Sequence, residues 1–332
     1  MFILGYHAQA QQNCADILKN AEKNFDNGKI FDVFSLLQPC IENGFSKADK
    51  IRAYKLLILS YLYSDNQANA DKYIREILLL DPDQRPLDNI DPMEYKREFD
   101  KFRKHPVFTI GGFGGTNYSV YQPLFIRSAE NTNTNTVKDF VKMYNGKFRY
   151  QFGILSEWYL NSKMQLELDA IFKGYSYSYK NQNFLGVLSQ ELIENQSWLE
   201  LPLQFKYTFK KQESKWRPYM NIGVRFNLLI NAVASTATLE TIKLPAPKLN
   251  KIRKNVYLSP VFGGGIKYKI SAGQFIFVDF RSNLAFNNLV KKSTYNEGPL
   301  ADIGYIDNDF TLSNFAFSIG FIKAFYNPKK IN

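Results

Sequence analysis

The spacing of apolar residues changes near residue 105. Residues 12–104 place apolar side chains every three or four positions, which predicts amphipathic helices. Residues 106–325 alternate apolar and polar side chains with a period of two, which predicts half-buried strands. The pattern therefore predicts an α + β multidomain protein, in which a helical domain over 12–104 precedes a strand-rich domain over 105–332.

The strand-rich half divides into eight aromatic-rich runs. Strands are predicted at 107–124, 146–160, 164–180, 197–210, 216–231, 255–270, 273–288 and 309–325. Their connectors alternate in length, since 125–145, 181–196, 232–254 and 289–308 are long and the connectors between these are short. An even strand number with this alternation is typical of a bacterial outer-membrane barrel. We therefore expect an eight-stranded antiparallel transmembrane β-barrel with its short turns and both chain ends in the periplasm.

The charged residues decide which face of these strands contacts lipid. In 197–210, Leu201 and Leu203 lie on one face, and Glu200 and Lys206 lie on the other. A soluble sandwich would bury the apolar face, whereas mid-strand charges of both signs fit a small barrel filled by ion pairs, with lipid outside and no solute channel. The expected interior polar network comprises Arg149, Glu167, Glu200, Lys206, Arg225, Asp279 and Arg281.

Aromatic residues near the strand ends are expected to form the two interfacial girdles of such a barrel. These residues are Trp158, Tyr159, Trp198, Trp216, Tyr257, Tyr268 and Tyr326.

The helical half contains two segments with a helix-turn-helix rhythm. The A-x-x-x-[FY]-x-x-G-x-[FY] pattern of Ala21–Phe31 and the L-D-P of Leu80–Pro82 resemble tetratricopeptide repeats, a family that binds peptides or proteins in a concave groove. Packing between helices is the favoured role of the pattern residues themselves. Two repeats bury little core, so we expect helix 93–104 or a partner to complete the module.

Cys14 opens the first predicted helix and Cys40 closes the second, so an antiparallel hairpin places them side by side. In an oxidising compartment they would form a disulfide, and closing a loop of about 25 residues would stabilise the module by roughly 3 kcal/mol. Two buried free thiols are the alternative.

Residues 1–11, M-F-I-L-G-Y-H-A-Q-A-Q, contain a short apolar stretch followed by a small-x-small cleavage pattern at Ala8–Ala10. The basic region that usually precedes such a stretch is missing. We interpret the segment as the remnant of a secretory signal peptide, with an ordinary N-terminal tail as the alternative.

Charge is concentrated in the second half. The chain has 42 basic and 31 acidic residues, a net charge of +11; residues 1–105 hold 15 and 16 of these, so the remainder holds 27 and 15 and carries +12. A basic domain can indicate nucleic-acid binding. Here the basic residues interleave with apolar strands and form no basic helix, so no nucleic-acid partner is expected.

The candidate chemistry is sparse. His7 and His105 are the two histidines, which excludes zinc or iron sites built on several histidines and disfavours a Ser–His dyad at the outer rim. We therefore expect no enzyme and no cofactor. Lys248, Lys251 and Arg253 lie in a predicted long loop and could contact lipopolysaccharide phosphates, although a merely solvated loop is favoured. A weak calcium site could be formed by Glu297, Asp302, Asp307 and Asp309, although a solvated loop is again favoured.

Several strand motifs resemble the PorT-like outer-membrane β-barrel family of the Bacteroidota lineage. Gly111–Ser119 is similar to its opening G-x-x-x-G-x-N-x-S, and Leu199–Tyr207 to its [LI]-E-[LIV]-P-L-x-x-K-Y strand. Arg217–Gly223, Gly263–Tyr268 and Val278–Arg281 are similar to the strands that follow. The resemblance covers about two-thirds of the chain, and the helical extension departs from the plain family. It implies an outer-membrane protein that, in some members, serves secretion or surface assembly.

Together these features predict a non-enzymatic outer-membrane protein whose barrel contacts outer-membrane lipid and anchors a periplasmic docking module, residues 12–104. The expected partner is a periplasmic or envelope protein in envelope biogenesis or secretion. The alternative is a surface-loop binding protein or adhesin, and an outer-membrane enzyme is the least favoured class.

Overall fold

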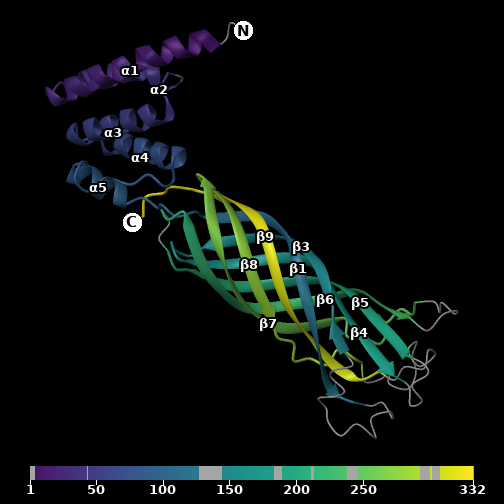
Figure 1. Cartoon of the computed structure of the whole chain (residues 1–332). Coiled ribbons are helices and arrows are strands. Elements are labelled where there is room, and N and C mark those ends of the chain that lie inside the picture. Colours follow the sequence, from purple (N-terminus) through teal and green to yellow (C-terminus); the bar gives the residue numbers. More distant parts are fainter. Residues whose placement is uncertain are drawn as a thin grey trace. The chain divides into compact units, whose positions relative to one another are not determined.

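The computed structural model describes residues 4–42, 44–126, 144–182, 189–210, 213–237, 246–291, 300 and 307–331. Contacts divide the chain into two compact units. The helical unit comprises Met1–Val107 with Phe325–Asn332, and the barrel unit comprises Phe108–Ala324. Figure 1 shows helices in the first unit and a closed set of strands in the second.

The helical unit consists, in its described residues, of helices of 8 to 23 residues. Its helices are α1 (Leu4–Asp26), α2 (Ile30–Ile41), α3 (Lys47–Tyr63), α4 (Gln67–Leu80) and α5 (Met93–Asp100). Gly28 between α1 and α2 has a φ of 77°, a left-handed conformation that glycine adopts without steric cost. Ser46 and Asn66 cap α3 and α4, because each side-chain oxygen accepts a backbone N–H of the first turn. None of the described helices is long and apolar enough to cross a membrane.

The core of the helical unit is formed by apolar residues of all five of these helices. Tyr95 and Phe99 of α5 are buried in it, together with Phe102 just beyond the helix. Burial raises the pKa of the Tyr95 hydroxyl, and the Asp91 carboxylate raises it further. The structure joins Cys14 of α1 to Cys40 of α2 by a disulfide. These contacts give the five helices one shared core.

The last residues of the chain pack with the helices, not with the strands. Phe102 forms an antiparallel bridge with Lys330, and the Arg103 N–H donates to Lys329 O at 2.9 Å. Lys330 Nζ lies 2.7 Å from Asp71 Oδ2 of α4. The sequence pattern predicts a barrel over 105–332. The structure differs at the end of this range, because the backbone hydrogen bonds above hold 325–331 against the end of α5.

The barrel unit is an antiparallel sheet whose two edges meet. Its strands are β1 (Phe108–Phe125), β2 (Tyr144–Gly146), β3 (Phe148–Tyr159), β4 (Met164–Gln182), β5 (Ser189–Thr208), β6 (Trp216–Ala237), β7 (Val256–Ser271), β8 (Gln274–Asn283) and β9 (Asp309–Phe325). The short β2 is separated from β3 by Lys147 alone, so the two form one interrupted strand. The neighbours run β2-β4-β3-β1-β9-β8-β7-β6-β5, and a further β4–β5 pairing closes the sheet into an eight-stranded barrel.

Closure around β1 depends on close backbone approach. A Cβ on Gly111 or Gly115 would lie 2.2 or 2.0 Å from a carbonyl oxygen of β9, at Phe321 and Phe317 respectively. Larger residues would force β1 and β9 apart. Figure 1 shows these two strands side by side.

The β4–β5 pairing has a gap at Pro202. Leu168 pairs with Leu203 and Ile171 pairs with Glu200, but the register omits the two positions between them. Proline has no backbone N–H to donate to a ladder, which accounts for a break at this place. On its other side β5 shifts register against β6 at Ser197 and Trp198. The strand that carries the Leu199–Tyr207 motif is therefore irregular against both of its neighbours.

The outer surface of the barrel is apolar and its interior is charged. Ile154 of β3, Ile222 of β6 and Leu258 of β7 are 63%, 66% and 61% exposed, whereas Glu157, Glu200 and Asp279 are at most 1% exposed. This is the sidedness that the mid-strand charges predicted, because charges inside a closed barrel can pair while the apolar rows face hydrocarbon.

Some strand limits differ from those predicted. β5 begins at Ser189, not at 197, and β6 continues to Ala237 beyond the predicted end at 231. β8 ends at Asn283, before the predicted end at 288, because Asn287 leaves the ladder and its Nδ2 donates to Leu258 O at 2.7 Å.

Candidate functional site

A cluster of ion pairs fills the middle of the barrel. Glu157 of β3 accepts from Lys206 Nζ at 2.7 Å and from Lys267 Nζ at 2.6 Å. Lys206 also forms an ion pair with Glu167 of β4. All four side chains are at most 4% exposed. The four charges come from β3, β4, β5 and β7, and each occupies an inward position of its strand.

Arg281 of β8 joins three carboxylates. Its Nε lies 2.5 Å from Asp279 Oδ1 and its Nη2 lies 2.9 Å from Glu167 Oε1, while Nη1 forms an ion pair with Asp169. Tyr219 donates its hydroxyl to Asp279 Oδ2 at 2.7 Å. The planar guanidinium suits this role because its nitrogens point in fixed directions toward several acceptors.

Glu200 of β5 organises a further set of groups. It forms an ion pair with Arg225 of β6, its Oε2 lies 3.8 Å from Lys173 Nζ, and it accepts the Tyr175 hydroxyl at 2.5 Å. In these three sets the buried cations Lys173, Lys206, Arg225, Lys267 and Arg281 are matched by the buried anions Glu157, Glu167, Asp169, Glu200 and Asp279. Five charges of each sign cancel, as burial in a barrel surrounded by hydrocarbon requires.

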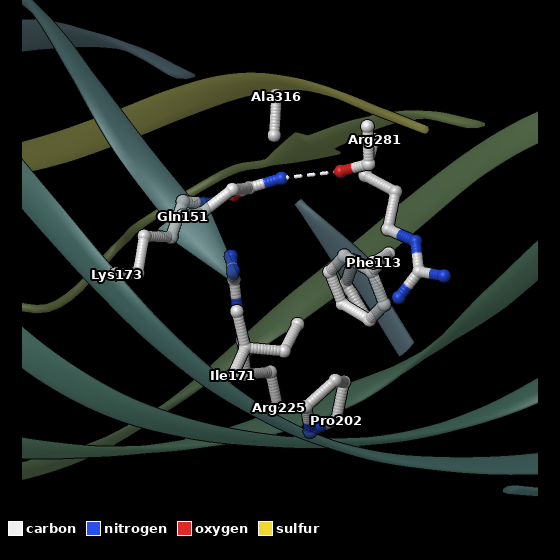
Figure 2. Close-up of a pocket in the computed structure, with 10 residues that line it drawn as sticks. Phe113, Gln151, Ile171, Lys173, Pro202, Arg225, Arg281 and Ala316 are labelled. Atoms are coloured by element: carbon white, nitrogen blue, oxygen red, sulfur yellow. Dashed lines mark hydrogen bonds between the residues drawn. The ribbon is translucent and has the colours of Figure 1, made fainter. Parts of the chain in front are cut away.

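A small cavity lies among these groups (Figure 2). It has a volume of about 10 Å³ and is lined by Gln151, Lys173, Arg225 and Arg281 among others. Figure 2 shows the Gln151 amide directed at a hydroxyl oxygen, the bond of 2.6 Å from its Nε2 to Ser318 Oγ. A space of this size has room for a single water molecule.

Toward the long loops the lumen becomes aromatic. Tyr121 of β1 stacks on Tyr144 with ring centroids 3.8 Å apart and on Phe310 of β9 at 4.8 Å. Leu249 and Leu289, from segments that follow β6 and β8, are buried against the same cluster. We call the buried residues around Tyr121, Tyr144 and Phe310 the aromatic cap; it lies at the loop end of the described lumen.

Arg253 links residues of the aromatic cap, and its position differs most from the one predicted for it. It is 0% exposed, its Nη2 lies 2.5 Å from Glu194 Oε2, and it also forms an ion pair with Asp307. Its position in a predicted loop had suggested a contact with lipopolysaccharide phosphates. The guanidinium cannot make this contact because it is buried between its two counter-ions. Lys248 and Lys251 remain exposed.

The other predicted residues divide as follows. Glu167, Glu200, Lys206, Arg225, Asp279 and Arg281 lie together in the buried network. Arg149 does not join them: it is half-buried, and its guanidinium lies 5.5 Å from the Tyr150 ring centroid.

Two of the predicted girdle residues are interior. Trp198 and Tyr257 are 1% and 6% exposed and pack against each other with ring centroids 5.1 Å apart. Their inward register places them in the lumen, whereas Trp158 and Trp216 face outward.

Of the acidic positions named for a calcium site, Asp307 pairs with Arg253. Glu297 and Asp302 lie outside the described residues. Among the described residues no group of three or more His, Cys, Asp or Glu side chains is placed to hold a metal ion.

Sequence reasoning missed the groups that anchor the cap. Glu194 lies on β5 where a loop was expected, and it accepts the Tyr177 hydroxyl at 2.6 Å. Gln196 donates to the same carboxylate at 2.5 Å. Continuing the period of two backward from Glu200 through Trp198 would have placed both residues inside the barrel.

The helical unit presents a run of aromatic rings that reaches its surface. Phe34 of α2 contacts Tyr61 of α3 with centroids 4.3 Å apart, and Tyr61 stacks on Tyr73 of α4 at 5.8 Å. Phe31 adjoins Phe34 and is 78% exposed. We call Phe31, Phe34, Tyr61 and Tyr73 the aromatic run. Tyr73 is buried, Phe34 and Tyr61 are half-buried, and Phe31 is exposed.

A closed sheet with an apolar exterior and a lumen of paired charges defines a membrane-spanning β-barrel. The sequence profile of the outer membrane protein beta-barrel domain family matches residues 102–291. The chain belongs to this family and is an outer-membrane β-barrel protein. A comparison with curated proteins finds no match.

Solved structures of small barrels are similar to the strand-rich part. The outer membrane protein OprG from Pseudomonas aeruginosa is 12% identical, with a TM-score of 0.40, and covers 68% of this chain and 99% of its own. Ail, the attachment invasion locus protein of Yersinia pestis, is 8% identical with a TM-score of 0.30, covering 66% and 99%. The outer membrane enzyme PagL is 12% identical with a TM-score of 0.26, covering 65% and 99%.

Proposed function

We propose that the barrel anchors the helical unit in the periplasm, where the unit docks a partner protein in envelope biogenesis or secretion. The observation that carries this proposal is the aromatic run, whose exposed end at Phe31 serves no packing need of the described chain. An aromatic side chain left 78% exposed beside buried ones is a common anchor for a partner. The proposed periplasmic side follows from the strand topology, because β1 begins and β9 ends on the side of the short turns.

The filled lumen supports an anchoring role. Ion pairs occupy the middle of the described barrel, and the aromatic cap occupies its loop end. These side chains fill the lumen where a solute would pass, which favours anchoring over transport. The finer assignments rest on resemblance: the motifs of β1 and β5 are similar to the PorT-like family, and the helices are similar to tetratricopeptide repeats. Both favour docking over catalysis, and the absence of an enzymatic activity is part of the proposal.

Photo-crosslinking in intact cells tests the docking role. A benzoylphenylalanine replaces Phe31 in the full chain, and a second strain carries it at Ile90, which is similarly exposed at 74% in the same unit. We expect one discrete envelope-protein adduct from position 31 and a weaker or different pattern from position 90. Equal diffuse labelling from both positions, or no adduct from 31, would contradict docking at the aromatic run.

A second candidate function is binding at the cell surface through the long loops. The observation that favours it is the length of β4, β5 and β6, which have 19, 20 and 22 residues. About 9–11 residues suffice to cross the hydrocarbon region, so these strands would hold their loops well clear of the membrane. Lys248 and Lys251 would then contact lipopolysaccharide phosphates. Substituting both by Gln should weaken retention on lipopolysaccharide-coated beads, and unchanged retention would exclude this contact.

A further inference from the structure

The short-turn end of the barrel unit carries a belt of lysines. Lys163 lies in the β3–β4 turn, Lys210 and Lys215 in the β5–β6 turn, Lys269 near the end of β7 and Lys323 near the end of β9. Within the described residues of these turns Glu213 is the one carboxylate. We call these five residues the lysine belt. It gives this rim a local excess of positive charge that the balanced interior lacks.

Exposed aromatic rings lie directly beside the belt. Phe209 precedes Lys210 and is 50% exposed, and Trp216 follows Lys215 and is 57% exposed. Trp216 also pairs in register with Tyr268, with ring centroids 4.5 Å apart. Tyr and Trp rings settle at the level of lipid headgroups. One further residue adds about 3.3 Å along a strand, so the lysines reach the level of the phosphates.

Three members of the belt are available to a ligand. Lys163, Lys210 and Lys215 are exposed, and within the described part of the chain none of them forms an ion pair. At the opposite end, Lys147 and Lys180 lie 3.9 and 3.7 Å from the same carboxylate, Glu191. Lys248 and Lys251 at that end are exposed and form no ion pair among the described residues, so unpaired lysines occur at both ends of the barrel.

We propose that the lysine belt binds the anionic headgroups of glycerophospholipids in the leaflet around the short turns. The inference depends on the membrane position of the barrel and not on any partner of the helical unit. An ammonium on a flexible stem can follow a mobile phosphodiester while its methylenes cover the aromatic rings. The belt would fix the depth of the barrel and collect anionic lipid around it.

Tryptophan quenching by brominated lipid tests the proposal on the full chain. The protein is reconstituted in phosphatidylcholine vesicles containing an equal fraction of brominated phosphatidylglycerol or brominated phosphatidylcholine. Trp158 and Trp216 face outward near the belt at 42% and 57% exposure, and Trp198 is shielded in the lumen at 1%. We expect the apparent association of phosphatidylglycerol to exceed that of phosphatidylcholine by roughly fivefold or more, the effect of about one lysine near an anionic surface.

The triple variant K163Q/K210Q/K215Q should lose this preference, and added salt should reduce it in the wild type. The matched control K180Q/K248Q/K251Q removes the same charge from exposed lysines of the long-loop end. This control should retain the preference for phosphatidylglycerol. Heat-modifiable gel mobility verifies that each variant is folded. Equal quenching by both lipids in the wild type, or a preference that survives in the triple variant, would overturn the proposal.

Discussion

Lys267 Nζ lies 2.6 Å from Glu157 Oε2, although 110 residues separate the two in sequence. Glu157 also accepts Lys206 Nζ and has no exposed surface. One carboxylate on β3 therefore bridges cations from β5 and β7 across the lumen. Because the surrounding lipid offers no other counter-ion, strands far apart in the sheet depend on one another through this residue.

Replacing Glu157 by Gln should destabilise the barrel strongly. Lys206 retains Glu167, but Lys267 would be left buried without the partner that the structure gives it. Removing one member of a buried pair typically costs about 3–5 kcal/mol. Urea unfolding in lipid vesicles, followed by tryptophan fluorescence, measures this change.

The control for that variant is Glu191→Gln. Glu191 is a half-buried carboxylate of the loop end whose partners Lys147 and Lys180 lie at 3.9 and 3.7 Å. Its loss should change the unfolding free energy by less than about 1 kcal/mol. Equal effects of the two substitutions would mean that burial of Glu157 does not govern its contribution.

Replacing Pro202 by Val should strengthen the barrel. The new N–H can donate across the gap in the β4–β5 register, and a net gain of about 1 kcal/mol per backbone hydrogen bond is typical. Pro218→Val serves as the matched control, since the β6–β7 register is continuous at Pro218. A fall in stability for the first variant, measured by the same urea unfolding, would show that Pro202 is required by packing and not merely tolerated.

The sequence predicted the strands best where they cross the membrane. β1, β7 and β9 lie within about a residue of their predicted limits, because hydrocarbon outside and ion pairs inside impose opposite chemistry on alternate positions. The pattern failed over 189–196. Outward positions there are as polar as inward ones, as Glu191 and Asn195 show beside Glu194 and Gln196. A strand with polar residues on both faces has no period of two to detect.

The interior sites were predictable only as a set of charges. Alternation identifies Glu167 and Arg281 as inward-facing, but no local pattern indicates that they meet, since 114 residues separate them. Arg253 shows the limit most clearly. The nearby Lys248 and Lys251 are basic and exposed, whereas its counter-ions Glu194 and Asp307 come from segments 59 and 54 residues away. Closure of the barrel, which a single sequence does not encode locally, creates these contacts.

Removing the disulfide should weaken the helical unit alone. The C14S/C40S double variant opens a loop with a sequence separation of 26, which should cost roughly 3 kcal/mol. Thermal unfolding of the helices, followed by circular dichroism, should shift to lower temperature, and dithiothreitol should reproduce the shift in the wild type. The heat-modifiable mobility of the barrel should stay unchanged. No response to reduction would mean that the bond adds nothing to the stability of the unit.

Deleting residues 327–332 should loosen the end of α5. The segment contributes the Lys329 carbonyl that accepts the Arg103 N–H, the Asn327 carbonyl that accepts the Arg103 guanidinium at 2.8 Å, and the Lys330–Asp71 ion pair. Phe102, 2% exposed in the structure, would lose part of its cover. Hydrogen–deuterium exchange should therefore accelerate at residues 101–103 and not in α3. The milder variant Lys330→Ala removes a partly exposed ion pair and keeps the backbone bridge, so it should leave this exchange nearly unchanged. Because backbone pairing distinguishes the two variants, equal acceleration in both would show that the Lys330 side chain, not the strand-like bridge, holds the tail in place.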